Sequence, residues 1–148
     1  MKIYISGVMQ GSIKGKGIQG QGYRQMISDA VKTCHPEAEI YDPFSAFPGS
    51  VEFDDRRAKH ALFTMAQEAA AADILIAYLP EASMGTALEM VRAYDNGKTI
   101  LSISALEENW FIRAVSAKIF TSLDEFEAWI SQTQLSELLT DQANPNAS

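Results

Sequence analysis

One strand–loop–helix unit in the middle of the chain constrains the fold more than any other stretch. Residues 74–79 form a short, almost continuous apolar run, which is typical of a β-strand buried on both faces of a parallel sheet. Pro80 ends this strand. Ser83 is a favourable N-cap residue, and the helical pattern that follows it stops at Asn96-Gly97. The unit therefore predicts a buried strand that leads through a short loop into a helix.

Strands and helices alternate along most of the chain. Short strands are predicted at 2–6, 38–41, 74–79, 98–104 and 118–121, and helices at 23–34, 54–71, 83–95 and 123–130. This alternation predicts a single-domain α/β fold with one doubly wound, five-stranded parallel sheet in the order 2-1-3-4-5, as in flavodoxin-like and Rossmann-like proteins. We expect the domain to span residues 1–132 of the 148, followed by a short C-terminal helix and a frayed tail over 133–148.

Apolar periodicity predicts which side of two helices is buried. In the helix at 23–34, Met26, Ile27, Ala30 and Val31 recur at helical spacing and are expected on the buried face. In the helix after Ser83, Leu88 and Val91 are expected to pack on the sheet.

The loop before the central helix is the place where a ligand site is expected. Ligands of open parallel sheets bind at the carboxyl ends of the strands, and Ser83, Gly85 and Thr86 directly follow such an end. Their backbone N–H groups and the positive end of the helix dipole suit a phosphate or a sugar oxygen. Glu89 lies four residues after Gly85, so the two share a helix face and a ligand could approach the carboxylate. From spacing alone, Glu89 is either a catalytic group or a solvated residue paired with Arg92.

The segment from Asp73 to Glu89 resembles the signature of an enzyme family. An Ala-Asp pair opens the apolar strand, and Ser-x-Gly-Thr-x-x-Glu follows it. This pattern is similar to that of the nucleoside 2-deoxyribosyltransferases, which include the 2′-deoxynucleoside 5′-monophosphate N-glycosidases. The resemblance implies cleavage or transfer of an N-glycosidic bond with Glu89 as nucleophile and no metal or cofactor. It also implies that Ser83, Gly85 and Thr86 bind the 5′ end of the substrate.

The resemblance extends to residues outside this segment. Tyr4 and Gly7 match positions at which, in the family, a tyrosine hydroxyl orients the catalytic carboxylate and a glycine lets the backbone approach the sugar. Without the family, Tyr4 reads as an ordinary strand aromatic. Asn109 fits, less specifically, a family loop that supplies Asn or Ser to the substrate of a neighbouring subunit, which implies a homodimer or a higher homo-oligomer. The expected strand order would bring Tyr4, Gly7, Ser83 and Glu89 together.

One position departs from the family pattern. Family members usually carry an aspartate eight or nine residues before the Asp that opens the next strand, and it is thought to act with the leaving base as a proton donor. Counting back from Asp73 leads to Met65 and Thr64. Glu68, one helical turn away, is a candidate substitute. The departure leaves open a non-catalytic nucleotide-binding or signalling module of the same fold.

Two further patterns support alternative functions. Gly-Thr-x-x-Glu is also similar to the core of the phosphoribohydrolases that cleave nucleoside monophosphates, although those usually carry Pro-Gly-Gly where this chain has Ala82-Ser83-Met84. Residues 15–20 match G-x-G-x-x-G, and Asp42 follows about 20 residues later, as in dinucleotide-dependent oxidoreductases. In that fingerprint the first glycine directly follows the strand, whereas here it comes later. We therefore expect residues 11–22 to form either a mobile loop or lid over the ligand site, with lysines that attract phosphate, or a plain flexible loop.

Charge and cysteine content exclude several other classes. The formal net charge of -7 argues against nucleic acid and anionic membranes as partners. Cys34 is the single cysteine, so the chain has no internal disulfide and no thiolate metal cluster. No segment resembles a signal peptide, and no apolar run approaches membrane-spanning length. We expect a cytoplasmic protein whose partner is a small-molecule nucleoside or nucleotide.

Overall fold

The computed structural model of the protein describes residues 1–12 and 14–141. The predicted frayed tail lies largely outside these residues. The strands are β1 (Lys2–Gly7), β2 (Glu39–Tyr41), β3 (Ile74–Tyr78), β4 (Thr99–Ile103) and β5 (Lys118–Phe120). The helical segments are α1 (Gly22–Cys34), α2 (Pro43–Ala46), the 3-10 turn η1 (Ser50–Glu52), α3 (Asp55–Ala71), α4 (Met84–Asp95), α5 (Trp110–Val115), α6 (Leu123–Ile130) and α7 (Leu135–Asp141). Within the described ranges, no helix is long and apolar enough to cross a membrane.

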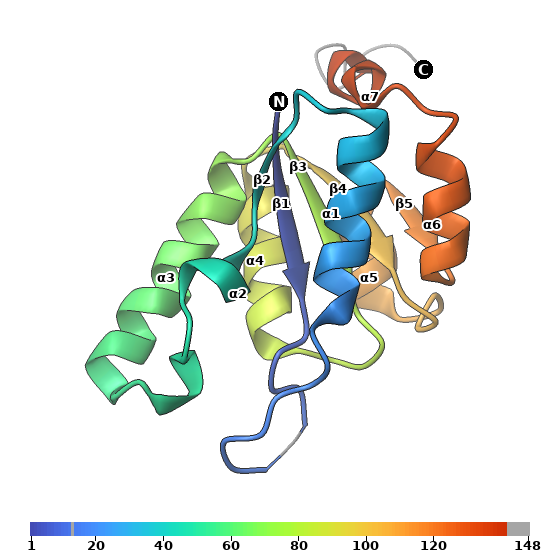
Figure 1. The fold of residues 1–148 in the computed structure, drawn as a ribbon. Coiled ribbons are helices and arrows are strands. Elements are labelled where there is room, and N and C mark those ends of the chain that lie inside the picture. The colour runs from blue at the N-terminus through green and yellow to red at the C-terminus, as the bar shows by residue number, and fades with distance from the viewer. Residues whose placement is uncertain (13, 142–148) are drawn as a thin grey trace.

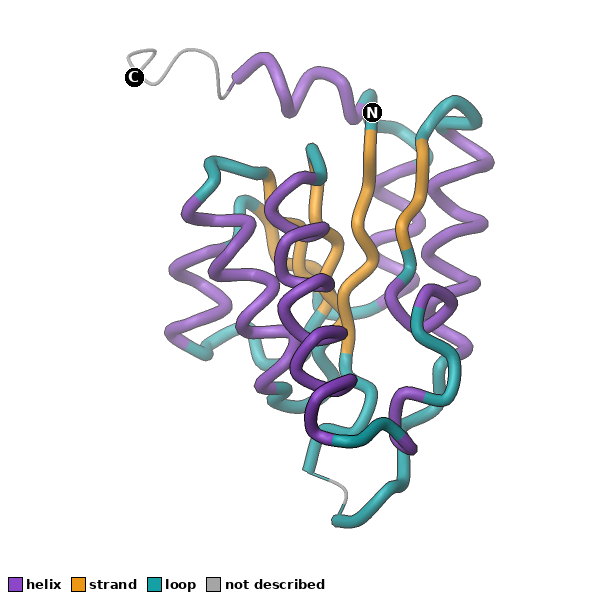
Figure 2. The backbone as a smooth tube through the Cα atoms, turned by 90° about the vertical axis from the view of Figure 1, so that its left-hand side faces the viewer, coloured by secondary structure: helices purple, strands orange, loops and turns teal. Residues whose placement is uncertain are grey.

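The five strands form one parallel sheet in the order β2-β1-β3-β4-β5, which confirms the predicted fold. In the central pair, Tyr4 of β1 is in register with Leu75 of β3, and Gly7 is in register with Tyr78. Helices cover both faces of the sheet (Figures 1 and 2). The strand order reverses between β1 and β3, so the carboxyl ends of these two strands lie side by side at the topological switch point.

Alternate residues of β1 face two different layers of the domain. Ile3 and Ile5 belong to a core that includes residues of α1 and α6, together with Leu135 of α7. Tyr4 belongs to a second core, built with residues of α3, α4 and α5. Side chains two positions apart in a strand share a face, so Ser6 lies on the same side as Tyr4. The chain thus places two polar groups on the side of β1 that α4 covers.

The structure corrects two predicted helix faces. In α1, Met26 is 45% exposed, and Arg24 is buried instead. Arg24 turns inward because its guanidinium bonds to backbone carbonyls of β1. In α4, Leu88 is only partly buried and Val91 is 37% exposed, while Met90 packs in the core beneath the helix.

Candidate active site

The start of α4 forms one wall of the site at the carboxyl ends of β1 and β3. The Ser83 hydroxyl oxygen caps the helix, since it accepts hydrogen bonds from the Thr86 backbone N–H at 3.4 Å and from the Thr86 hydroxyl at 3.1 Å. The first turn of α4 contains no acidic residue. The positive end of its dipole is therefore not neutralised by a side chain of that turn and remains suited to an anion.

Glu89 provides the buried carboxylate of the site. Its side chain is 4% exposed and accepts a hydrogen bond from the Ser6 hydroxyl. The interpretation of Glu89 as a solvated partner of Arg92 is therefore wrong. Burial raises the pKa of Glu89 to about 7, whereas the hydrogen bond from Ser6, the nearby Tyr4 hydroxyl and the positive charge of Arg24 lower it. Near neutral pH this carboxyl group is thus populated in both protonation states.

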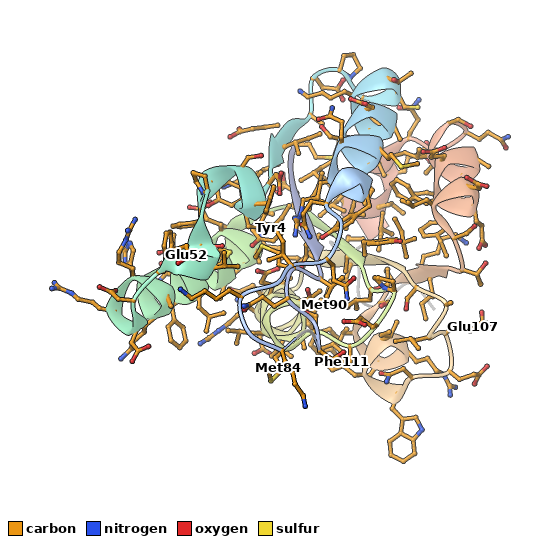
Figure 3. All side chains as sticks on the ribbon, turned by 60° about the horizontal axis from the view of Figure 1, so that its bottom comes forward. Tyr4, Glu52, Met84, Met90, Glu107 and Phe111 are labelled. Carbon is orange, nitrogen blue, oxygen red and sulfur yellow. The ribbon has the colours of Figure 1, made fainter. Side chains whose placement is uncertain are left out.

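Tyr4 lies beside Glu89 in the interior, and Figure 3 views the molecule from this end of the sheet. Its ring stacks on Tyr41 with a centroid separation of 5.4 Å. Its hydroxyl is buried and is directed at Glu89 closely enough to lower the carboxyl pKa, yet no acceptor among the described residues meets full hydrogen-bond geometry. Burial and the Glu89 charge raise the pKa of Tyr4, so the phenol remains protonated and can donate.

Arg24 fixes the end of β1 from behind the site. Its guanidinium donates to the carbonyl oxygens of Ile5 and Gly7, each at 3.1 Å, and to the Asp42 carboxylate at 2.9 Å. Asp42 also caps α2, so it is engaged in structural contacts rather than presented to a ribose. The G-x-G-x-x-G match at 15–20 lies in the long loop that joins β1 to α1, and its first glycine does not directly follow the strand, which ends at Gly7. Neither feature forms the predicted dinucleotide fingerprint.

A cavity of about 310 Å³ opens against Glu89. This volume falls within the usual range of small-molecule sites. One part of its wall is the backbone-rich start of α4 together with the end of β1, contributed by Gly7, Ser83, Gly85 and Thr86. The opposite part is apolar, comes from α3 and the segment before it, and includes Val51, Phe53, Leu62 and Met65. The cavity therefore has a polar end and an apolar end, as a sugar or phosphate joined to a flat base requires.

The loop after β1 also contributes to the cavity. Met9, Gln10 and Gly11 line it. Farther along this loop, Lys16 forms an exposed ion pair with Glu52 at 2.7 Å. The loop therefore walls the site as expected, and Lys16 contacts a carboxylate of η1.

The structure brings together most of the predicted site residues but not all of them. Five of them line one cavity, and the hydroxyl of Tyr4 lies beside the Glu89 carboxylate and lowers its pKa. Asn109 does not line this cavity but lines a neighbouring one of about 370 Å³. Its side-chain oxygen caps α5 by accepting the backbone N–H groups of Phe111 at 3.0 Å and Ile112 at 3.3 Å.

The position of the family aspartate is occupied by an apolar side chain. Met65 is 7% exposed and lines the apolar end of the cavity. Glu68, the candidate substitute, instead forms an ion pair with Lys2 at 2.5 Å and is absent from the cavity wall. Substitution by Glu68 is therefore contradicted, because one helical turn along α3 carries its carboxylate to the strand end opposite the site.

Two residues of the site were missed by sequence reasoning. Ser6 had a usable signal, because it lies two positions after Tyr4 on the strand and must share its face. Arg24 had no such local signal, since an arginine in an amphipathic helix is normally assigned to solvent. Its role becomes visible only when α1 is packed on β1.

The fold and site define a class: a flavodoxin-like, doubly wound α/β domain with a buried glutamate at the switch point between β1 and β3. No family model matches the chain, and no curated protein matches it by sequence.

Solved structures with this architecture point to a more particular likeness. The 2-deoxyribosyltransferase of Bacillus psychrosaccharolyticus aligns with a TM-score of 0.69 and 16% identity, over 93% of this chain and 96% of that chain. BlsM aligns with a TM-score of 0.65 and 15% identity, over 99% and 96% of the two chains. A conserved protein from Enterococcus faecalis V583 gives 0.59 and 17%, over 89% and 98%. The predicted resemblance to nucleoside 2-deoxyribosyltransferases is thus confirmed as a likeness of fold over most of the chain.

Proposed function

We propose that this protein cleaves or transfers the N-glycosidic bond of a nucleoside or nucleoside 5′-monophosphate, with Glu89 as the nucleophile. The observation that carries the proposal is the buried Glu89 carboxylate, which Ser6 holds at the wall of a cavity with one polar and one apolar end. The fold shared with a 2-deoxyribosyltransferase supports it. The assignment rests on the site, because one fold can host many activities.

The proposed reaction proceeds through a covalent ester. A carboxylate oxygen of Glu89 attacks C1′ while the base leaves, and water or a second base then attacks C1′ and releases the carboxylate. The approach to Glu89 passes Gly85, where an added Cβ would meet no protein atom within 4 Å. This open space is consistent with a sugar lying against the first turn of α4.

The nucleophile acts in its charged form, so the groups that favour ionisation of Glu89 take part in the proposal. Ser6 donates a hydrogen bond to the carboxylate, and Arg24 contributes a positive charge from behind β1. Tyr4 is a positioning residue whose protonated hydroxyl faces the same carboxylate. Together these groups offset part of the cost of burying the charge.

The start of α4 is proposed to hold the 5′ end of the substrate. The backbone N–H groups that precede Thr86 in its first turn, together with the positive dipole end, favour a phosphate or a hydroxyl oxygen. Ser83, Gly85 and Thr86 all line the cavity there.

A second copy of the chain is proposed to cover the face beside this site. Met84 and Trp110 are 89% and 87% exposed, and large apolar side chains of this kind are typical of interfaces. In such a dimer Asn109 would reach the substrate of the neighbouring subunit.

Base release is the direct test of the function. The protein is incubated with a panel of nucleosides and their 5′-monophosphates, and free base is measured by chromatography. We expect release from at least one substrate, and we expect Glu89→Ala to abolish it while the circular dichroism spectrum is retained. Nucleotide-induced thermal stabilisation without release from any substrate would support the non-catalytic binding module instead. Unchanged turnover in Glu89→Ala would remove Glu89 as nucleophile.

A further inference from the structure

The cavity beside Glu89 contains few groups that can exchange a proton. Among the described residues that line it, Glu89 has the one ionisable side chain. Its other polar side chains are an amide and three hydroxyls, from Gln10, Ser50, Ser83 and Thr86, and none of these donates a proton to a base near neutral pH. The side chains that the structure does not describe, those of Ile13 and 140–148, include one ionisable group, Asp141. Asp141 is the last residue of α7, which lies at the amino end of the sheet, opposite the cavity (Figure 1).

Acidic residues near the cavity are engaged away from it. Glu52 pairs with Lys16 at 2.7 Å on the surface. Asp54 caps α3 by accepting a backbone N–H at 2.8 Å. Glu81 accepts a hydrogen bond from the Ser12 backbone at 3.0 Å and lines the neighbouring cavity. None of these three side chains belongs to the wall of the Glu89 cavity.

The apolar end of the cavity is where the base would lie. Its side chains, including Phe53, Leu62 and Met65, offer van der Waals contact and no proton. Met65 of α3 is 7% exposed and forms part of this wall. An acidic side chain at position 65 could face the base, but this chain has a methionine there. A neutral base leaves slowly without protonation, since general acid catalysis typically contributes about 10²–10⁴-fold.

We infer, building on the proposed function, that this site acts on N-glycosides of cationic heterocycles, such as N-glycosyl pyridinium compounds or N7-alkylated purine nucleosides. Their base carries a positive charge before the bond breaks and leaves uncharged, so the protein need not supply a proton. The described part of the cavity wall contains no cationic side chain, and it contains the carboxylate of Glu89. Both features favour binding of a positively charged ring.

The two steps balance without a further reactant. A Glu89 oxygen bonds to C1′, the C1′–N bond breaks, and its electron pair neutralises the ring nitrogen. A water oxygen then bonds to C1′, the ester C1′–O bond breaks, and the carboxylate is restored. The proton lost by this water goes to solvent, so hydrolysis of a cationic substrate releases one proton, whereas a neutral nucleoside passes that proton to its base.

A matched pair of substrates tests the inference in the wild-type protein. 7-Methylguanosine and guanosine differ by one methyl group and the charge of the ring, and both are assayed as nucleosides and as 5′-monophosphates. We expect kcat/KM for base release to be at least about 100-fold higher for the methylated compounds, because no acid compensates for the neutral ring. This release must be absent in Glu89→Gln.

Each alternative outcome is informative. Similar kcat/KM values for the charged and neutral compounds, both dependent on Glu89, would overturn the inference and leave the proposed function standing. If no base is released from any of these compounds, from nicotinamide riboside or from the general nucleoside panel, both the inference and the proposed function are overturned.

Variants at Met65 provide a reciprocal test. Met65→Asp places an acid at the apolar end and is expected to raise kcat/KM for guanosine about tenfold or more, which narrows the ratio between the two substrates. Met65→Asn is the matched control, since it has a similar shape and cannot transfer the proton, and it should give no such gain. An unchanged ratio in Met65→Asp with a retained circular dichroism spectrum would contradict the inference. If that variant fails to fold, the wild-type substrate pair decides.

Discussion

Two helices of this protein begin with a serine cap and use their glutamate in opposite ways. In α4, Ser83 accepts the Thr86 backbone N–H at 3.4 Å, and in α6, Ser122 accepts the Glu125 backbone N–H at 3.2 Å. In α6 the Glu125 carboxylate returns to the backbone N–H and hydroxyl of Thr121, at 2.6 and 2.8 Å. This carboxylate therefore reaches one residue past the N-cap Ser122, in a variant of the capping box, and lies at the positive end of its own helix.

In α4 the glutamate comes one turn later and is buried. Burial raises the pKa of Glu89 to about 7, whereas hydrogen bonds from Thr121 lower the pKa of Glu125. The first turn of α4 is left without an acid. The contrast shows that a capped helix start is structural when its acid lies in the first turn. When the acid lies one turn later and is buried, as in α4, the N-terminal end of the helix can bind a ligand instead.

The largest expected difference between the two glutamates is catalytic. Glu89→Gln removes the proposed nucleophile and should lower kcat/KM for base release by about 10³-fold or more. Glu125→Gln is the same substitution at the exposed cap, and it should leave kcat/KM unchanged. Initial rates of base release measure both. A comparable loss in the two variants would show that Glu89 acts only through the fold.

The second difference concerns stability and pH. The pKa of Glu89 is raised from 4.5 to about 7, so the unfolded chain gives up this proton at lower pH than the folded protein does. The free energy of unfolding should therefore decrease by about 3 kcal/mol through this group as pH rises from 4.5 to 7. Glu125 has the opposite sign, because its stabilisation is present above its ordinary pKa and is lost on acidification.

Urea denaturation at a series of pH values separates these contributions. Glu89→Gln should be more stable than the wild type above pH 7, and the two should converge near pH 4.5. A constant difference between them across this range would contradict burial as the cause of the pKa shift.

A smaller effect, on the pH dependence of kcat/KM, is expected when the hydroxyl groups that contact the two carboxylates are removed. Ser6→Ala removes a hydrogen bond that favours the charged form of Glu89. The acidic limb of the pH profile of kcat/KM should then move to higher pH by about one unit. Thr121→Ala removes the corresponding hydroxyl from Glu125 and should leave the profile in place. A profile that does not move in Ser6→Ala would exclude Glu89 as the group that titrates.

The smallest effect concerns the caps themselves. Ser83→Ala and Ser122→Ala should each reduce the free energy of unfolding by about 1 kcal/mol, as loss of an N-cap usually does. Only Ser83→Ala should also raise KM, by several-fold, for a 5′-phosphorylated substrate. Chemical denaturation and steady-state kinetics measure the two effects. An equal change of KM in Ser122→Ala would remove the functional distinction between the helix starts.

The sequence predicted what depends on short-range chemistry. Ser83 marked the start of α4, and the apolar run at 74–79 marked the buried strand beside β1. The spacing of Gly85 and Glu89 placed both on one helix face, and both line the same cavity. Each of these signals lies within a few residues of its effect.

What the sequence did not predict depends on contacts between distant segments. A serine in a buried strand looks like any small residue, and Ser6 acquires a role only when α4 brings Glu89 against it, 83 positions away. Arg24 is buried only because the strand end offers carbonyl oxygens to its guanidinium. In α4 the buried side differs from the predicted one by one position, since Met90 rather than Val91 faces the core.

The hydroxyl of Tyr4 makes no hydrogen bond of full geometry to any described residue, so the scaffold gains little from that oxygen. When Glu89 is protonated, replacing the phenol with a phenyl ring would remove an unsatisfied buried donor and favour folding, whereas the charged carboxylate would lose the hydroxyl that faces it. Random drift would therefore convert this position to phenylalanine in any lineage released from selection for chemistry. Persistence of tyrosine at position 4 across divergent descendants would record continued demand for the reaction, independently of any assay.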